Sequence, residues 1–254
     1  MSDKKSLVRI PEWRIEDIPL SCTIIIIAPP DTGKSMLIEN LAFYNKHKYP
    51  VARLFMGTGS ESKGNRRFKE IFGDLFITNG YDETEMKRVI QRQRTCLDEN
   101  TPVPYCFTCV DDCLDDVKAL KTKTMNGIFK LGSQHWAQCF CIASQYGLDF
   151  QPGARKCASF VIIGREENEV ERKKLYENYG GICGEYRDFC DLLDQITGDY
   201  TFLVIKNRSQ SRNREENIFF YRTTKIKSWK FGCEEFRKWN EERYNQNYKE
   251  KFDT

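Results

Sequence analysis

Short apolar runs alternate along the chain with longer segments in which apolar and charged residues recur at helical spacing. The apolar runs are bounded by Gly, Pro, Asp or Asn, as buried strands commonly are; they cover residues 23–28, 51–56, 105–110, 139–144, 160–163 and 200–205. The amphipathic segments predict helices over residues 33–45, 83–98, 115–131 and 166–179. This alternation predicts an α/β fold in which helices cover both faces of a mostly parallel central sheet.

Two further elements are predicted near the end of the chain. Residues 218–222 favour a late strand, and residues 233–252 favour a terminal helix with an aromatic stripe. The stripe consists of Phe236, Tyr244, Tyr248 and Phe252, with Trp239 nearby. It packs either on its own domain, the commoner case, or on a neighbouring subunit. With no internal repeat or long linker, the expected organisation is an N-terminal arm (1–20), one α/β domain (21–232) and a helical C-terminal extension (233–254).

Composition narrows the class of protein. The chain has 254 residues, of which 40% are hydrophobic and 30% charged, enough for a sizeable core. Its 40 Lys and Arg against 37 Asp and Glu give a net charge of only +3, which excludes a histone-like polyelectrolyte but not a local basic surface. No apolar run approaches the roughly 20 residues that span a bilayer, and no signal-peptide core is present, so we expect a soluble intracellular protein. The odd number of cysteines, 11, favours reduced thiols over a disulfide scaffold.

The most specific motif is a phosphate-binding loop (P-loop) between the first strand and the first helix. It reads Ala28-Pro29-Pro30-Asp31-Thr32-Gly33-Lys34-Ser35. In this context backbone N–H groups at the helix start converge on phosphate oxygens. We expect Lys34 to neutralise the β- and γ-phosphates of ATP and Ser35 to bind Mg²⁺. The rest of the nucleotide-binding segment is Pro29, Pro30, Asp31, Thr32, Gly33 and Met36. Ala28 replaces the usual first glycine.

A pair of acids follows the apolar run at 105–110. Asp111 is the candidate to hold the Mg²⁺ shell, and Asp112 is the candidate to polarise the attacking water. Cys106 and Cys109 precede them with the CxxC spacing of zinc sites. Residues three apart on a strand point to opposite faces, so core cysteines are the favoured interpretation.

Other features discriminate among P-loop proteins. The segment Asn45-Lys46-His47-Lys48 lacks the acid and the position of a guanine-recognition motif, so a GTPase switch is excluded. A small-molecule kinase stays open. Gln145 ends the apolar run at 139–144, where its amide could touch the γ-phosphate and the attacking water. Arg155 follows shortly after, in a turn that begins at Pro152.

These motifs, in this order, resemble the genome-packaging ATPases of large nucleocytoplasmic DNA viruses of the poxvirus, iridovirus and marseillevirus kind, within the FtsK–HerA superfamily. The resemblance runs from about residue 20 to 232. Its segments are the P-loop, Val110-Asp111-Asp112-Cys113, His135-Trp136, Ser144-Gln145-Tyr146-Gly147-Leu148, Pro152-Gly153-Ala154-Arg155, residues 163–168, residues 172–179 and Phe219-Phe220-Tyr221-Arg222.

The resemblance implies a RecA-like P-loop NTPase core that hydrolyses Mg²⁺-ATP and a homo-oligomeric ring that moves double-stranded DNA. It also implies a capsid or inner-membrane packaging vertex as partner, and the viral factory in the host cytoplasm, with the virion as a second location. The protein itself would not be integral to the membrane. The alternative from another class is a nucleotide-dependent assembly or scaffold protein that moves nothing.

One departure from the family affects catalysis. Relatives tend to carry Asn-Gly-Arg-His before the fourth strand, whereas this chain has Leu131-Gly132-Ser133-Gln134-His135. The arginine that would act on a neighbouring subunit is absent there. Arg155 is the best remaining candidate, and Arg165, which could instead pair with Glu166 or Glu167, is the second.

A basic stretch near the end of the domain is the candidate DNA contact. Residues 206–230 hold eight Lys and Arg residues against two acids. Lys206, Arg208, Arg212 and Arg214 lie in its loop-like first part, where Asn and Ser separate the charges. Such loops contact phosphates without reading bases, as a translocating motor requires. The alternative is an ordinary solvated face, and residues 63–69 and 87–94 are competing patches.

Overall fold

The computed structural model describes residues 10–57, 63–113, 117–146 and 152–244. Within these ranges, eight strands form one sheet in the order β3-β2-β4-β5-β1-β6-β7-β8. The strands are β1 (Cys22–Ile27), β2 (Val51–Met56), β3 (Ile77–Asn79), β4 (Cys106–Asp111), β5 (Gln138–Ser144), β6 (Phe160–Ile163), β7 (Thr201–Lys206) and β8 (Ile218–Arg222). Strands β1 to β6 pair in parallel, and β7 and β8 add an antiparallel edge, so the predicted mostly parallel α/β sheet is confirmed.

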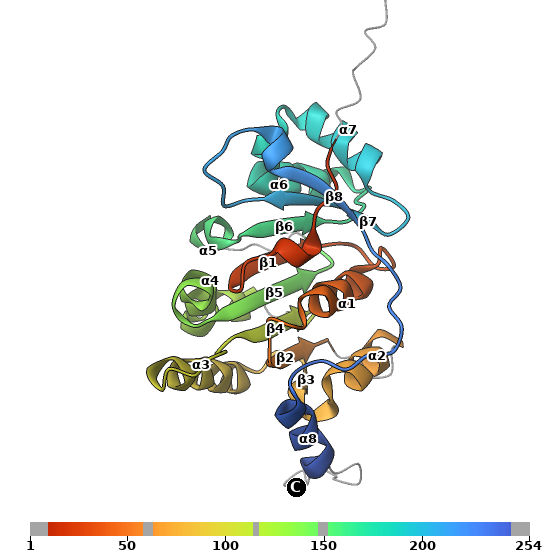
Figure 1. Cartoon of the computed structure of the whole chain (residues 1–254). Helices are drawn as coiled ribbons and strands as arrows, with labels where there is room; N and C mark the ends of the chain where they lie inside the picture. Colours follow the sequence, from red (N-terminus) through yellow and green to blue (C-terminus); the bar gives the residue numbers. More distant parts are fainter. Residues whose placement is uncertain (1–9, 58–62, 114–116, 147–151, 245–254) are drawn as a thin grey trace, which may run out of the picture.

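Helices cover both faces of this sheet (Figure 1). They are α1 (Lys34–Asn45), α2 (Lys63–Phe72), α3 (Glu83–Asp98), α4 (Lys123–His135), α5 (Pro152–Cys157), α6 (Glu169–Tyr179), α7 (Tyr186–Ile196) and α8 (Glu234–Arg243). Apolar side chains of α1 and α2 pack on one face, and those of α3, α4, α6 and α7 pack on the other. No helix in the described part of the chain is long and apolar enough to cross a membrane.

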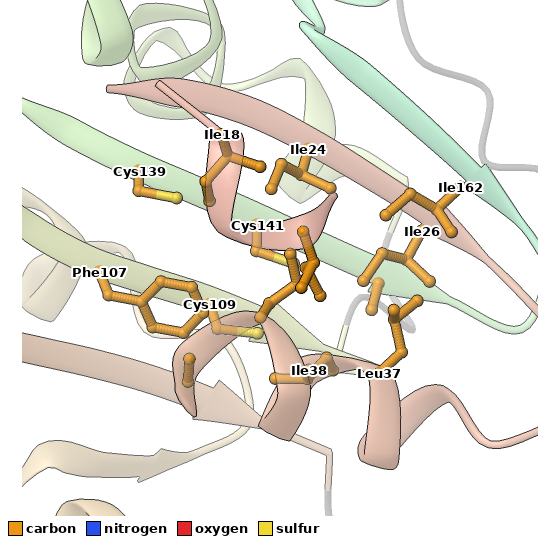
Figure 2. Packing of buried hydrophobic residues seen from close by; sticks show 14 of the residues in the cluster. Ile18, Ile24, Ile26, Leu37, Ile38, Phe107, Cys109, Cys139, Cys141 and Ile162 are labelled. Carbon is orange, nitrogen blue, oxygen red and sulfur yellow. The ribbon is translucent and has the colours of Figure 1, made fainter. Parts of the chain in front are cut away.

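Alternation along the central strands sends buried side chains into two separate cores. Ile24 and Ile26 of β1 point to the α1 face, where they meet Leu37 and Ile38 (Figure 2). Ile25 of β1 belongs to the opposite core. The same alternation separates the two CxxC thiols. Cys109 lies in the α1-side core. Cys106 shares the opposite face of β4 with Thr108, two residues further along, and hydrogen-bonds to it. All 11 cysteines are free.

Three predicted helices differ from the observed ones by three residues or more. The expected helix at 115–131 is instead a 3-10 turn, Val117–Lys121, followed by α4, because the Thr122 side chain caps α4 by accepting from the Met125 N–H. Helix α6 begins three residues later than expected because Asn168 caps it in the same way. Helix α8 ends at Arg243, since Tyr244 already has extended backbone. Tyr248 and Phe252 lie outside the described residues.

The terminal helix packs partly on its own domain. Phe236 is buried, and its ring stacks on Phe76 with centroids 3.8 Å apart. Trp239 is 51% exposed. At the other end of the chain, Trp13, Ile15 and Ile18 are buried in the α1-side core. The described parts of the expected arm and extension therefore both contribute to the core of the sheet domain.

Parallel pairing brings the ends of the central strands to one edge. Ile27 of β1 is the register partner of Ser144 in β5 and of Ile163 in β6. Asp111 of β4 is the partner of Ala143. The P-loop, the two acids and Gln145 therefore follow adjacent strands at the same carboxyl edge, which is where open α/β sheets bind ligands.

Candidate active site

The loop between β1 and α1 is a tight turn that ends in free backbone amides. Thr32 Oγ1 donates a hydrogen bond to the Pro29 carbonyl at 2.7 Å, which closes the turn. Gly33 precedes the helix with φ 96°, a left-handed conformation that favours glycine. No side chain among the described residues caps the start of α1. Its first N–H groups therefore remain available to an anion.

The other predicted nucleotide-binding residues lie along the same loop. Pro30 and Asp31 are exposed at its tip, and Asp31 has φ 60°. Ser35 and Met36 are half-buried in the first turn of α1, directly after Lys34. The Ser35 hydroxyl is thus in the turn of the helix whose amides face the proposed phosphate position, as the P-loop motif requires.

Gly164 explains how the loop accepts Ala28 in place of glycine. Ala28 is fully buried, and its N–H donates to the Ser144 carbonyl at 3.0 Å. A β-carbon at position 164, which follows the neighbouring strand β6, would lie 2.7 Å from the Ala28 β-carbon. Because position 164 has no side chain, there is space for the methyl group of Ala28, and the loop can keep its path without a glycine at position 28.

Two carboxylates and one ammonium group meet in front of the P-loop. Lys34 Nζ lies 3.7 Å from Asp111 Oδ1 and 3.6 Å from Asp112 Oδ2. Gln145 at the end of β5 donates a hydrogen bond from its Nε2 to Asp112 Oδ2. The structure thus brings together Lys34, Asp111, Asp112 and Gln145, which the sequence assigned to one site from three separate segments.

The backbone holds Asp112 in an uncommon conformation. Its φ is 49°, in the left-handed region that Asp and Asn enter more readily than most residues. Its N–H donates to the Ala143 carbonyl at 3.0 Å. A β-carbon at position 57 would lie only 2.1 Å from the Asp112 carbonyl oxygen, so Gly57 is required beside it. Sequence reasoning missed Gly57, which reads as an ordinary strand boundary after residues 51–56.

The charged groups of this cluster suit a nucleotide and its metal ion. Lys34 Nζ and Asp111 Oδ1 are buried, and neither has a hydrogen-bond partner among the described residues. Buried polar atoms normally have partners, so these two atoms fit a phosphate oxygen and a divalent cation. Burial raises the pKa of Asp111 to about 6, with Lys34 opposing the shift and Asp112 adding to it. A bound cation beside Asp111 would favour its charged form.

Arg155 lies at the amino edge of the sheet, where the parallel strands begin, opposite the carboxyl edge that carries the P-loop. It belongs to α5, which leads back to the start of β6 (Figure 1). Its carbonyl accepts a hydrogen bond from Asn207 Nδ2, just after the end of β7. A six-residue strand such as β1 spans about 20 Å. Arg155 is therefore not brought to the Lys34 cluster of its own chain. Arg165 is at the carboxyl edge, where it pairs with Glu167 at 2.9 Å.

The predicted DNA-contacting residues share the amino edge with Arg155. Lys206 ends β7, and Arg208, Arg212 and Arg214 follow in the exposed loop to β8. The later basic residues of the stretch lie elsewhere, because residues 224–227 run across α1 and α2. Asn40 Nδ2 donates to the Thr224 carbonyl, and Arg67 donates to the carbonyls of Ile226 and Lys227. The stretch at 206–230 is thus divided between two surfaces.

Together, the sheet order, the P-loop and the lysine–carboxylate cluster define a RecA-like P-loop NTPase fold. No family model matches the chain. The chain belongs to the family of the uncharacterised protein 075L of Invertebrate iridescent virus 6, with 33% identity over 228 residues, 89% of this chain and 87% of that protein. The uncharacterised protein 088R of Invertebrate iridescent virus 3 is 36% identical over 219 residues, 84% of this chain and 82% of its own length.

Solved structures share the fold at low sequence identity. One is the genome packaging NTPase B204 from Sulfolobus turreted icosahedral virus 2, in complex with AMP, with a TM-score of 0.57 and 12% identity. The match covers 82% of this chain and 100% of the B204 chain. The pCW3 conjugation coupling protein TcpA has a TM-score of 0.55 and 10% identity, covering 80% of this chain and 60% of its own. The resemblance drawn from the sequence motifs is confirmed: the relatives are proteins of large DNA viruses, and the fold is that of B204 and of FtsK–HerA-like ATPases.

Proposed function

We propose that this protein is the DNA-packaging ATPase of a large DNA virus, a homo-oligomeric ring that couples ATP hydrolysis to translocation of double-stranded DNA into the capsid. The observation that carries the proposal is the cluster of Lys34, Asp111, Asp112 and Gln145 beside an uncapped P-loop helix. B204 is a genome packaging NTPase and TcpA is a conjugation coupling protein, and both functions support DNA as the substrate that is moved.

The residues of the cluster divide the work of phosphoryl transfer. The α1 amides and Lys34 bind the β- and γ-phosphates and stabilise charge that shifts during transfer. Ser35 and Asp111 would hold Mg²⁺, which would neutralise part of the negative charge of the nucleotide. Asp112 accepts the proton of the attacking water, and the Gln145 amide, hydrogen-bonded to Asp112, orients that water and the carboxylate.

The opposite positions of Arg155 and the P-loop favour action between subunits. A guanidinium at the amino edge can complete the γ-phosphate site only of a neighbouring copy. The place of the family's missing arginine, at Ser133 and Gln134, is in the last turn of α4 at the same edge. Helices α4 and α5 pack together, so Arg155 and the position that it would replace belong to two adjacent helices.

The partners and location follow from the same proposal. The ring would sit at a packaging vertex of the capsid or inner membrane and act in the viral factory of the host cytoplasm, with some copies retained on the virion. The exposed loop with Lys206, Arg208, Arg212 and Arg214 would contact the phosphates of the duplex without base readout.

The direct test is the ATPase rate with and without duplex DNA. Mg²⁺-dependent hydrolysis that duplex DNA stimulates, regardless of its sequence, is the expected result. ATP binding without DNA-stimulated turnover would instead favour the assembly or scaffold protein. Transfer of the γ-phosphate to a metabolite would favour a small-molecule kinase.

Replacing Lys34 with Ala is expected to weaken ATP binding about 10- to 100-fold. The variant loses hydrogen bonds between charged groups, each worth about 1.5–3 kcal/mol. Calorimetric titration with ATP measures the effect, and thermal unfolding verifies that the variant is folded. Lys46→Ala is the matched control, because it removes the same charge just beyond the far end of α1. Unchanged ATP affinity in a folded Lys34→Ala variant would contradict the P-loop assignment.

Neutralising Arg208, Arg212 and Arg214 to Gln is expected to weaken duplex DNA binding equally for all sequences. The log–log dependence of affinity on salt should become shallower by about 0.9 for each lost phosphate contact. The matched control replaces Lys225, Lys227 and Lys230, three exposed lysines on the segment that crosses α1 and α2. If the salt dependence of DNA affinity becomes shallower only in the control variant, the DNA contact lies on that second surface instead.

A further inference from the structure

A strained turn precedes β7 at the edge of the sheet that carries the P-loop. The Thr201 N–H donates to the Gly198 carbonyl at 2.8 Å, and the two central residues, Asp199 and Tyr200, have φ of 45° and 60°. Two positive φ values define a type I′ turn, whose second central position strongly favours glycine. Tyrosine is unfavourable there, and outliers of this kind cluster at functional sites.

The turn places the Tyr200 ring against the P-loop. A β-carbon at position 33 would lie 2.7 Å from Tyr200 Cδ1 and 3.4 Å from its β-carbon, so the ring lies directly on Gly33. The Tyr200 carbonyl accepts hydrogen bonds from the Thr223 N–H at 3.0 Å and the Thr223 hydroxyl at 3.2 Å. These bonds fix the turn to the segment after β8 and hold the ring in this place.

The ring is also open to a ligand. Tyr200 is 51% exposed, although it contacts the glycine that precedes the catalytic lysine. The phosphates of a nucleotide are accounted for by the α1 amides and Lys34. What an aromatic face next to that loop can bind is the flat, apolar face of a base, because stacking is available to every base and is strongest for large ring systems.

We propose that Tyr200 is the base-stacking residue of this site and favours a purine nucleotide. The proposal rests on the nucleotide-hydrolysing function put forward above and adds the group that recognises the base. The strained backbone places the aromatic ring beside the P-loop. Glycine would suit the turn better, but it has no ring on which the base could stack.

Equilibrium binding separates the base from the phosphates. We compare ATP, CTP and inorganic tripolyphosphate, which has no base, on the unaltered chain and on Tyr200→Gly, Tyr200→Phe and Trp239→Ala. Tyr200→Gly should weaken ATP binding about 5- to 100-fold, reduce the preference for ATP over CTP and leave tripolyphosphate affinity unchanged. Tyr200→Phe should bind ATP like the unaltered chain. Trp239→Ala removes an equally exposed aromatic ring from α8 and should change none of the affinities.

The midpoint of thermal unfolding is a second measurement, and a purely structural role for Tyr200 predicts the opposite change in it. Because glycine suits the second central position of a type I′ turn, Tyr200→Gly should raise the midpoint of thermal unfolding while it lowers ATP affinity. A lowered midpoint with equal losses for ATP and tripolyphosphate would assign Tyr200 to loop structure and overturn the proposal, as would unchanged ATP affinity. Failure of the unaltered chain to bind either ATP or tripolyphosphate would contradict the proposed function itself, and base stacking with it.

Discussion

Asp112→Asn subunits are expected to bind ATP with nearly unchanged affinity and to hydrolyse it about 10²- to 10⁴-fold more slowly. The substitution removes the group that accepts the proton of the attacking water but leaves Lys34, Asp111 and the loop amides in place. Asparagine also tolerates the left-handed backbone at this position, where φ is 49°. Steady-state turnover and ATP binding, measured on the same preparation, separate chemistry from affinity.

Asp111→Asn is the comparison that tests the division of roles between the two acids. Asp111 is the buried member of the pair, with an oxygen that lacks a hydrogen-bond partner among the described residues. Its loss should raise the Mg²⁺ concentration needed for half-maximal ATPase activity, whereas Asp112→Asn should lower the maximal rate at any Mg²⁺ concentration. Identical Mg²⁺ titrations for the two variants would show that the acids share one role.

Arg155→Ala is expected to reduce ATP turnover by about 10³- to 10⁵-fold, the range found when arginine fingers are removed from other phosphoryl-transfer enzymes. ATP affinity should change little, because Arg155 is remote from the P-loop of its own chain. Lys156→Ala, an exposed neighbour on α5, controls for loss of positive charge at this edge. Full activity of Arg155→Ala would remove this residue from the site.

Mixed rings test whether the arginine acts on a neighbouring subunit. Arg155→Ala subunits keep their acids, and Asp112→Asn subunits keep their arginine. At some interfaces of a mixed ring an intact arginine therefore faces an intact acid, and part of the ATPase activity should return. Mixed rings of verified composition that stay inactive would argue against action between subunits.

The central strands could be predicted because their signal is local. Residues 51–56, 160–163 and 218–222 are apolar runs whose ends coincide with those of β2, β6 and β8. Helix α2 was missed because its first half is polar and basic, and its buried side chains among those described, Phe68, Ile71 and Phe72, come only near its end. Strand β3 has only three residues, too few to show alternation. Helix α7 was also not predicted, although Phe189, Leu193 and Ile196 recur at helical spacing in its sequence.

The site was predictable to the extent that its chemistry lies in strand ends. Asp111, Asp112 and Gln145 were identified because each ends an apolar run, and parallel pairing brings such ends together. Gly57 and Gly164 could not be identified in this way, because their role is to leave space for another segment's backbone or side chain. Tyr200 was missed for a similar reason: its position depends on a turn conformation that the residue type disfavours.

The contact between Ala28 and position 164 also constrains how this family can diverge. The two neighbouring strands hold one methyl group between them, and a second would lie 2.7 Å from the first. A side chain can therefore arise at position 164 only in a descendant that has already exchanged Ala28 for glycine. In the opposite order both positions would carry a methyl group at once, so an exchange in either direction has to pass through an intermediate with glycine at both positions.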